Sequence, residues 1–199
     1  MSSAVQLASA TLVSPASPKP ETGLGNISLA GQLLVASPNM EDPRFAQSVI
    51  LMIRHDNGGA MGIIVNRPIG RRPLADLLQA IGQDAAGVTG EAHIFFGGPV
   101  QPNLGFIVHS NEYRREGTID IDGRVAMTSS VEVLRDIGHN QGPAKSLIAF
   151  GYAGWAAGQL EGELAQNGWA MTPEDSTLVF GEDRAKVWGD AIERAAHHP

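Results

Sequence analysis

The residues best suited to bind a ligand are Asn66, Arg67 and Pro68, which directly follow an apolar stretch ending at Val65. Polar residues at the end of a buried strand lie where a sheet opens to solvent, and such positions commonly carry function. A guanidinium can hold an anionic group, and an amide can orient that group by hydrogen bonding. We therefore predict a ligand site with Arg67 as the anion contact. The alternative, that Arg67 is a surface cation capping a loop carboxylate such as Asp42, fits the sequence equally well.

Two histidines suggest a second kind of chemistry. If the apolar stretches at 94–96 and 106–108 pair as a hairpin centred near Gln101, His93 and His109 become cross-strand neighbours about 5 Å apart at Cβ. Imidazoles bind metals, and with a carboxylate such as Glu91 the pair could serve a metal-assisted hydrolase. The sequence indicates no third ligand, so we predict no metal site. His109 is kept in the predicted ligand site, and the hydrolase is kept as the alternative function.

Two glycine-rich segments could offer backbone N–H groups to an anion. Gly97 and Gly98 complete the predicted ligand site, although Pro99 has no N–H and a structural turn is the favoured interpretation. The segment 151–158 lacks the spacing of a dinucleotide fingerprint, so we interpret its glycines as packing residues. His55, which precedes Asp56, is expected to make local hydrogen bonds rather than to bind a metal.

The chain contains none of the motifs that define the common hydrolase, zinc protease, P-loop and EF-hand sites. With no cysteine, thiolate chemistry and disulfides are also excluded. We predict no catalytic residue and no cofactor. Whether the chain is an enzyme is left open, with a non-enzymatic module favoured.

Composition limits the partners. The chain has 199 residues, 14 basic and 21 acidic, for a net charge of −7, so it lacks the positive field that supplies most affinity for nucleic acid. Direct nucleic-acid binding is not expected, because the strongest basic cluster is only Arg67 with Arg71 and Arg72.

No stretch approaches the ~18 apolar residues of a membrane helix, and no secretory signal precedes the domain. We predict a cytoplasmic protein without membrane contact, with a flexible leader at 1–26 and a single domain at 27–199.

The apolar pattern predicts the elements that must position the site. Strands at 49–53 and 61–65 are expected to form a central hairpin around Asn57-Gly58, preceded by a strand at 32–36. Other strands are expected at 94–96 and 106–108, at 118–121 and 124–127, and at 147–150 and 177–180. Helices are expected at 73–81, 131–137, 159–166 and 184–195. Hairpins with helices between them favour an α+β fold, with a largely antiparallel sheet or flattened β-barrel flanked by helices.

Several short segments also stand in the order found in one bacterial family: Gly31–Ala36 with Asp42–Phe45, Ser48-Val49 before His55, Gly59–Pro68, Gly97–Val100, Gly105–His109, Gly151–Trp155 with Gly158–Glu161, and Asn167 before Trp169. Over roughly 31–192 the chain resembles the YqgE/AlgH family, with Gly168 standing where alanine is usual. The resemblance implies an α+β fold, a cytoplasmic location and no established enzymatic activity. Members are often labelled transcriptional regulators, which describes a phenotype more than a mechanism.

Together these observations favour a non-enzymatic binding or regulatory module. Its unidentified small molecule or partner protein would contact the end of the central hairpin, and any effect on transcription would be indirect.

Overall fold

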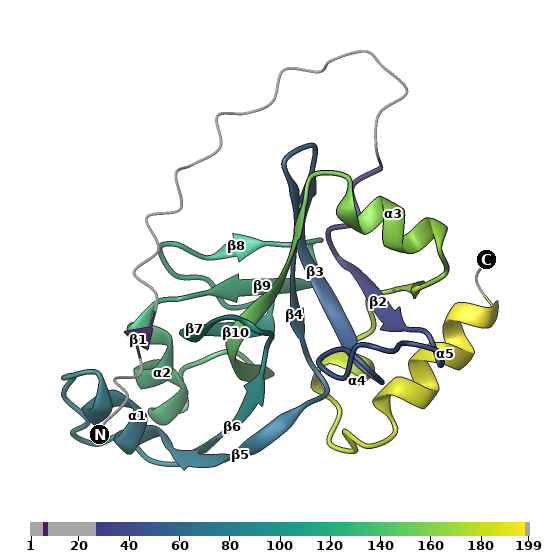
Figure 1. Cartoon of the computed structure of the whole chain (residues 1–199). Helices are drawn as coiled ribbons and strands as arrows, with labels where there is room; N and C mark the ends of the chain where they lie inside the picture. The colour runs from purple at the N-terminus through teal and green to yellow at the C-terminus, as the bar shows by residue number, and fades with distance from the viewer. Residues whose placement is uncertain (1–5, 8–26, 198–199) are drawn as a thin grey trace.

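The backbone is organised around a curled sheet, shown in Figure 1. The computed structural model describes residues 6–7 and 27–197. Within them, strands hydrogen-bond in the order β11-β2-β3-β4-β10-β7-β9-β8, with β6 also on β10, β5 on β6 and β1 on β7. The strands are β1 (Gln6–Leu7), β2 (Gln32–Ala36), β3 (Val49–Asp56), β4 (Gly59–Ile64), β5 (Pro68–Pro73), β6 (Glu91–Phe96), β7 (Val100–Ser110), β8 (Ile119–Asp120), β9 (Val125–Thr128), β10 (Ser146–Ala156) and β11 (Trp169–Pro173). Only β1–β7 and β6–β10 pair in parallel, so the predicted α+β fold with a largely antiparallel sheet is confirmed.

β3 and β4 form the central hairpin that the sequence predicts. They meet across the Asn57-Gly58 turn, and at the other end Ile50 pairs with Ile64. The chain therefore leaves the hairpin at Asn66, beside the start of β3. β2 pairs with β3 and β8 pairs with β9, as predicted. β2, β3 and β4 are covered on both faces, which explains why their sequences are almost continuously apolar.

The predicted hairpin of 94–96 with 106–108 is wrong, because β10 lies between β6 and β7. β10 runs parallel to β6 and antiparallel to β7. Three apolar segments of similar composition can pair in several orders, and their residue pattern does not say which. The predicted strand at 147–150 is also longer than expected, because β10 continues through the glycine-rich segment to Ala156, and its second half pairs with β4.

Five helices surround the sheet within the described residues: α1 (Leu74–Ala80), α2 (Val131–Gly138), α3 (Gln159–Ala165), α4 (Ser176–Phe180) and α5 (Val187–His197). Four of them overlap the predicted ranges. The strand predicted at 177–180 is wrong, because this segment forms α4. The Asp175 carboxylate caps that helix by accepting a hydrogen bond from Thr177 N at 2.7 Å. β5 and β11, which the sequence did not predict, pair with β6 and β2 respectively.

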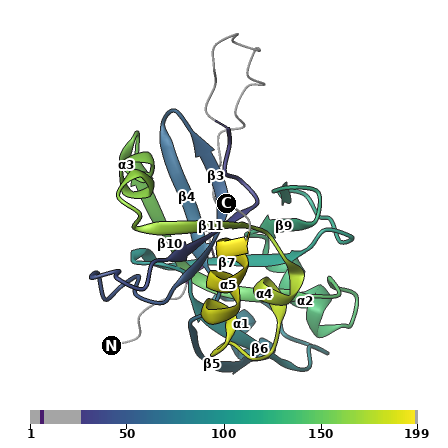
Figure 2. The same cartoon turned by 90° about the vertical axis from the view of Figure 1, so that its right-hand side faces the viewer.

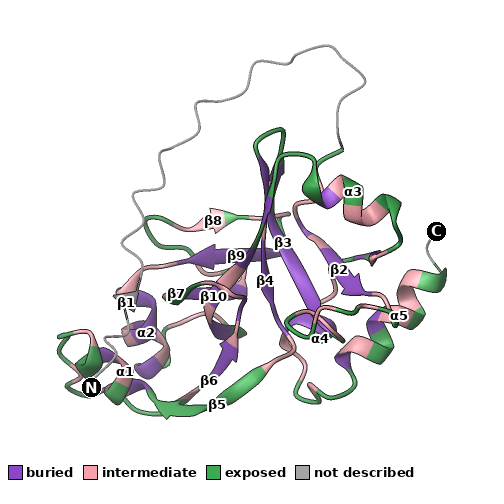
Figure 3. Cartoon of the chain, viewed as in Figure 1, coloured by how far each residue is buried: buried purple, intermediate pink, exposed green. Residues whose placement is uncertain are grey.

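Buried residues form three clusters between the sheet and the helices. Figure 3 colours the buried positions, many of them on the strands, purple. Alternate residues of β2 face opposite sides: Leu33 and Val35 join the cluster with α4 and α5, whereas Leu34 and Ala36 join the cluster with α3. Figure 2 shows α4 and α5 side by side. α1 and α2 cover side chains of β6, β7 and β10. The two ends of β10 are thus packed against different helices.

The predicted leader is described only at Gln6 and Leu7, which pair with Leu104 and Gly105. The rest of 1–26 lies outside the described residues. Among the helices of the described ranges, none combines the length and the apolar character needed to cross a bilayer.

Candidate functional site

Five of the six predicted site residues come together where β4 and β6 end. Ile64 N donates to the carbonyl of Gly97 at 2.8 Å, and Phe96 N donates to the carbonyl of Arg67 at 2.9 Å. Asn66, Arg67 and Pro68 therefore lie beside Gly97 and Gly98, although about thirty residues separate the two segments in the chain. Both segments run along the same edge of β10, because β4 pairs with its second half and β6 with its first.

Asn66 fixes the start of the hairpin. Its Oδ1 accepts from Val49 N at 2.9 Å, and its Nδ2 donates to the Gln47 carbonyl at 2.9 Å. Both polar atoms of the amide are thus engaged by the first residue of β3 and the segment just before it. We assign Asn66 the role of holding this segment against the end of β4.

Arg67 extends its guanidinium over the loop that precedes β3. Nη2 donates to the Ala46 carbonyl at 2.6 Å, and Nη1 donates to the Arg44 carbonyl. The Asp42 carboxylate instead pairs with Arg44 at 2.7 Å, and this contact holds the pKa of Asp42 below its ordinary value. Arg67 therefore caps the loop, as one of the two interpretations of the sequence expected, but through carbonyl oxygens rather than the Asp42 carboxylate. Burial lowers the pKa of Arg67, and the more distant Asp42 offsets only part of that effect.

A second arginine lies at the same end of β4 and was missed from the sequence. Arg184 Nη1 donates to the Val179 carbonyl at 2.7 Å and lies 3.3 Å from the Val65 carbonyl. Its guanidinium carbon lies 4.8 Å from the centre of the Phe95 ring, a cation–π contact. Burial lowers the pKa of Arg184. No local pattern indicates this role, because α4 and the loop after it bring Arg184 to the hairpin from 119 residues away.

The glycines of the predicted site pack against backbone. A Cβ on Gly97 would lie 2.3 Å from the Gly151 carbonyl oxygen, and one on Gly98 would lie 2.0 Å from the carbonyl carbon of Tyr152. Both glycines are buried. Their lack of side chains lets β6 and the turn after it approach β10 closely.

His109 lies away from the other predicted residues. It is buried on β7 and pairs with Ser146, about five residues along β10 from Gly151, which is roughly 16 Å at ~3.3 Å per residue. His93 is exposed on β6 and pairs with Arg71. Because β10 separates the two strands, these histidines do not form the expected cross-strand pair. Within the described ranges, no three histidine or carboxylate side chains are placed to hold a metal ion.

The His109 ring is held in one tautomer. Its Nδ1 lies 2.9 Å from the Ser110 carbonyl, which can only accept, so Nδ1 carries the proton. Nε2 is buried with no hydrogen-bond partner, and the Tyr113 ring meets the imidazole edge-on at 5.6 Å. Burial lowers the pKa of His109 below its ordinary 6.5.

This burial predicts acid sensitivity. Below pH 6.5 the unfolded chain protonates His109 whereas the folded chain resists protonation, so the free energy of unfolding should fall as the pH drops, by at most about 1.4 kcal/mol per pH unit. The slope fades as the pH rises through 6.5, because the unfolded chain then also loses the proton. Urea unfolding between pH 7.5 and 5 should show a smaller slope for His109→Gln than for wild type. The exposed His93→Gln variant should keep the wild-type slope, and equal slopes in all three proteins would contradict the prediction.

His55 makes a long-range contact rather than the expected local one. Its Nε2 lies 2.8 Å from Glu161 Oε1 on α3, and its Nδ1 accepts from Leu29 N at 3.3 Å. A hydrogen bond from its own backbone N–H and the one from His55 both lower the pKa of Glu161. His55 thus joins β3, α3 and the segment that enters β2.

Glu163 binds two buried indoles. One oxygen, Oε2, accepts from Trp155 Nε1 at 2.9 Å and from Trp169 Nε1 at 2.8 Å. The other, Oε1, accepts from Gln159 Nε2 at 3.0 Å. The two tryptophan rings meet edge-on, 6.0 Å between centroids. Trp155 therefore lies in the core, with Trp169 beside it, and α3 supplies the hydrogen-bond acceptor for both.

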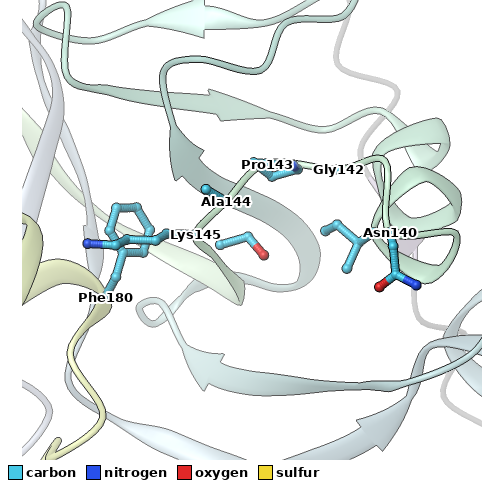
Figure 4. Close-up of a pocket in the computed structure, with 8 residues that line it drawn as sticks. Asn140, Gly142, Pro143, Ala144, Lys145 and Phe180 are labelled. Atoms are coloured by element: carbon cyan, nitrogen blue, oxygen red, sulfur yellow. The ribbon is translucent and has the colours of Figure 1, made fainter.

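A hollow of about 560 Å³ lies elsewhere, between α2, the start of β10 and α4. Figure 4 shows Asn140 at one end and Lys145 with Phe180 at the other. Lys145 Nζ donates a hydrogen bond to Ser176 Oγ at 2.8 Å. The hollow contains none of the predicted site residues, and its lining offers no cluster of converging charged groups. The end of the central hairpin is therefore the stronger candidate.

Comparison with known proteins agrees with this architecture. A family model described as AlgH-like matches residues 33–199. A UPF0301 protein of Jannaschia sp. (strain CCS1) is 41% identical, with 86% of this chain and 90% of that protein covered. A UPF0301 protein of Methylococcus capsulatus is 40% identical over 88% of this chain and 96% of its own length. The solution structure of the AlgH protein from Pseudomonas aeruginosa superposes with a TM-score of 0.68 at 37% identity, covering 89% of this chain and 92% of that one.

Proposed function

The chain belongs to the AlgH-like family, and we propose that it is a non-enzymatic binding module whose ligand or partner presents an anionic group to the end of the central hairpin. Arg67 and Arg184 would contact that group, and Asn66 would keep the neighbouring loop in place. We further propose that any regulatory effect on transcription passes through this partner, because the net charge of −7 disfavours direct contact with DNA.

Two half-buried guanidinium groups support the proposal. Arg67 donates to main-chain carbonyls of the loop before β3, and Arg184 donates to the carbonyls of Val179 and of Val65, two residues before Arg67. Neither has a carboxylate within ion-pair distance in the part of the chain that the structure describes. Nε of Arg67, and Nε and Nη2 of Arg184, retain donors without a partner among these residues. Partly desolvated cations with free donors are well suited to a charge-assisted bond with an anion.

The site can be tested by titrating the isotope-labelled full chain with phosphate, citrate and acetylated hexaglutamate. We expect at least one of these anions to shift the amide signals of residues 44–46 and 65–67, and Arg67→Gln to weaken that binding about tenfold, or ~1.4 kcal/mol. Arg67→Lys, which keeps the charge, should recover part of the loss. Arg54→Gln is the matched control, because Arg54 is exposed on β3, far from this end of the hairpin.

The result would go against the proposal if none of the anions bound, or if folded Arg67→Gln and Arg184→Gln variants kept wild-type affinity. A short DNA duplex at low salt serves as the comparison probe. We expect no binding of the duplex, since only a direct DNA reader would show salt-sensitive affinity.

A further inference from the structure

β5 follows Arg67 directly and forms an open edge of the sheet. All six of its residues, Pro68–Pro73, are exposed, and within the described residues it pairs only with β6. Ile69 is 63% exposed, and few other large apolar residues of the described chain are exposed to solvent. An edge strand presents unpaired backbone groups that can accept another extended chain.

The register shows which backbone groups are free. Leu74 N donates to the Gly90 carbonyl at 3.0 Å, and Arg72 lies opposite Ala92 in the same register. Because residues of an antiparallel pair alternate between bonding inward and pointing outward, the N–H and C=O of Arg71 point away from β6. Pro73 occupies the next outward position, where its missing N–H breaks no bond of the β5–β6 ladder.

The strand also carries two positive charges that no carboxylate in the described part of the chain neutralises. The side chains of Arg71 and Arg72 have no hydrogen bond or ion pair in the described part of the chain, whereas those of Arg44, Arg114 and Arg115 are each paired with an aspartate. The carboxylate nearest in register is Glu91, opposite Pro73, and it pairs with neither arginine. Acidic side chains on an added strand would meet both charges.

We propose that β5 is the docking strand for an extended acidic segment of a partner protein, which adds to the sheet alongside Arg71. This inference rests on the proposed function and names the partner as a polypeptide, whose chain would run along β5 and place an acidic group at Arg67. Main-chain hydrogen bonds to Arg71 would supply orientation, and Arg71 and Arg72 would select acidic sequences. The competing explanation is that the arginines and the flanking prolines only protect the edge from pairing.

The test uses the full chain and four capped octapeptides: one with four central Glu residues flanked by Val, one with Lys in place of Glu, and the Glu peptide N-methylated at alternate residues on one edge or on the other. Consecutive glutamates are needed because Arg71 and Arg72 are adjacent in β5 and face opposite sides of the sheet. We expect the Glu peptide to bind at least tenfold more tightly than the Lys peptide. N-methylation on the edge that faces β5 should weaken binding at least tenfold, and the Glu peptide should slow hydrogen exchange at the Arg71 amide. The double variant Arg71→Glu with Arg72→Glu should lose at least tenfold in affinity, whereas Arg54→Glu should not.

Equal affinity of the N-methylated and unmethylated Glu peptides on both edges, unchanged exchange at Arg71, or an unaffected double variant would overturn strand docking. Peptide binding that depends on Arg67 but not on β5 would overturn this inference and leave the anion site standing. Peptide binding that depends on β5 but survives Arg67→Gln would overturn the proposed anion site and leave the docking strand.

Discussion

Replacing Gly97 with alanine is expected to lower the free energy of unfolding by about 3 kcal/mol. The added Cβ would lie 2.3 Å from the Gly151 carbonyl oxygen and 3.1 Å from Ala149 Cβ, both on β10. The obstruction is backbone rather than the end of a flexible side chain. Relief therefore requires the end of β6 to move away from β10, which would disturb the junction where β4, β6 and β10 meet. Urea unfolding followed by circular dichroism measures the loss.

Gly70→Ala is the matched control for this substitution. Gly70 also lies on a strand of the same sheet, but a Cβ there would have nothing within 4 Å. We expect a change within about 0.5 kcal/mol. If the Gly97 and Gly70 variants unfolded at the same urea concentration, the close approach of β6 to β10 would be wrong, and Gly97 would be free to serve a ligand instead.

Replacing Glu163 with alanine is expected to lower the free energy of unfolding by about 3 kcal/mol. The substitution removes the oxygen that accepts from Trp155 and Trp169, which are only 7% and 6% exposed respectively. Each buried donor left without a partner costs about 1–3 kcal/mol. Urea unfolding gives the loss, and near-ultraviolet circular dichroism reports whether the two indoles lose their fixed environment.

Two variants separate this hydrogen-bonding role from a general effect of removing charge. Glu163→Gln keeps a carbonyl acceptor and should lose only about 1 kcal/mol, the value of an ordinary hydrogen bond. Glu116→Ala, at an exposed position, should change stability by less than about 0.5 kcal/mol. Equal losses for Glu163→Ala and Glu116→Ala would mean that the tryptophans do not depend on α3 for an acceptor.

Elements with strong local signals were predicted well. The Asn57-Gly58 turn and the apolar residues on both sides of it specify the β3–β4 hairpin, and the register that follows places Asn66 next to Ser48. α4 shows where such reasoning fails. Thr177–Phe180 has the β-branched and aromatic composition of a strand, but the Asp175 cap and burial of Leu178 and Val179 against the core stabilise a helical turn.

The residues of the candidate site also divide into those that local sequence signals indicated and those that only the tertiary structure identified. Asn66 and Arg67 were found because they end a predicted strand, and Gly97 and Gly98 because they punctuate another. Arg184 was missed, because a lone arginine in a C-terminal segment carries no signal until α4 brings it to Val65. His109 was grouped with His93 on an assumed hairpin, which the insertion of β10 removes.

By itself, then, the sequence determined the features that depend on short-range interactions. These are which segments are apolar, where the chain turns, which residues cap the ends of helices, and which chemistries are excluded because the residue types they need are absent. Only the tertiary structure decided which strands are neighbours, which charges lie together and which polar atoms are buried. The reason is that pairing energies among apolar strands are similar whatever their order, so the order is selected by the simultaneous packing of the whole chain. That packing brings Arg184 to Val65, two residues before Arg67, and it leaves β5 open at the edge of the sheet.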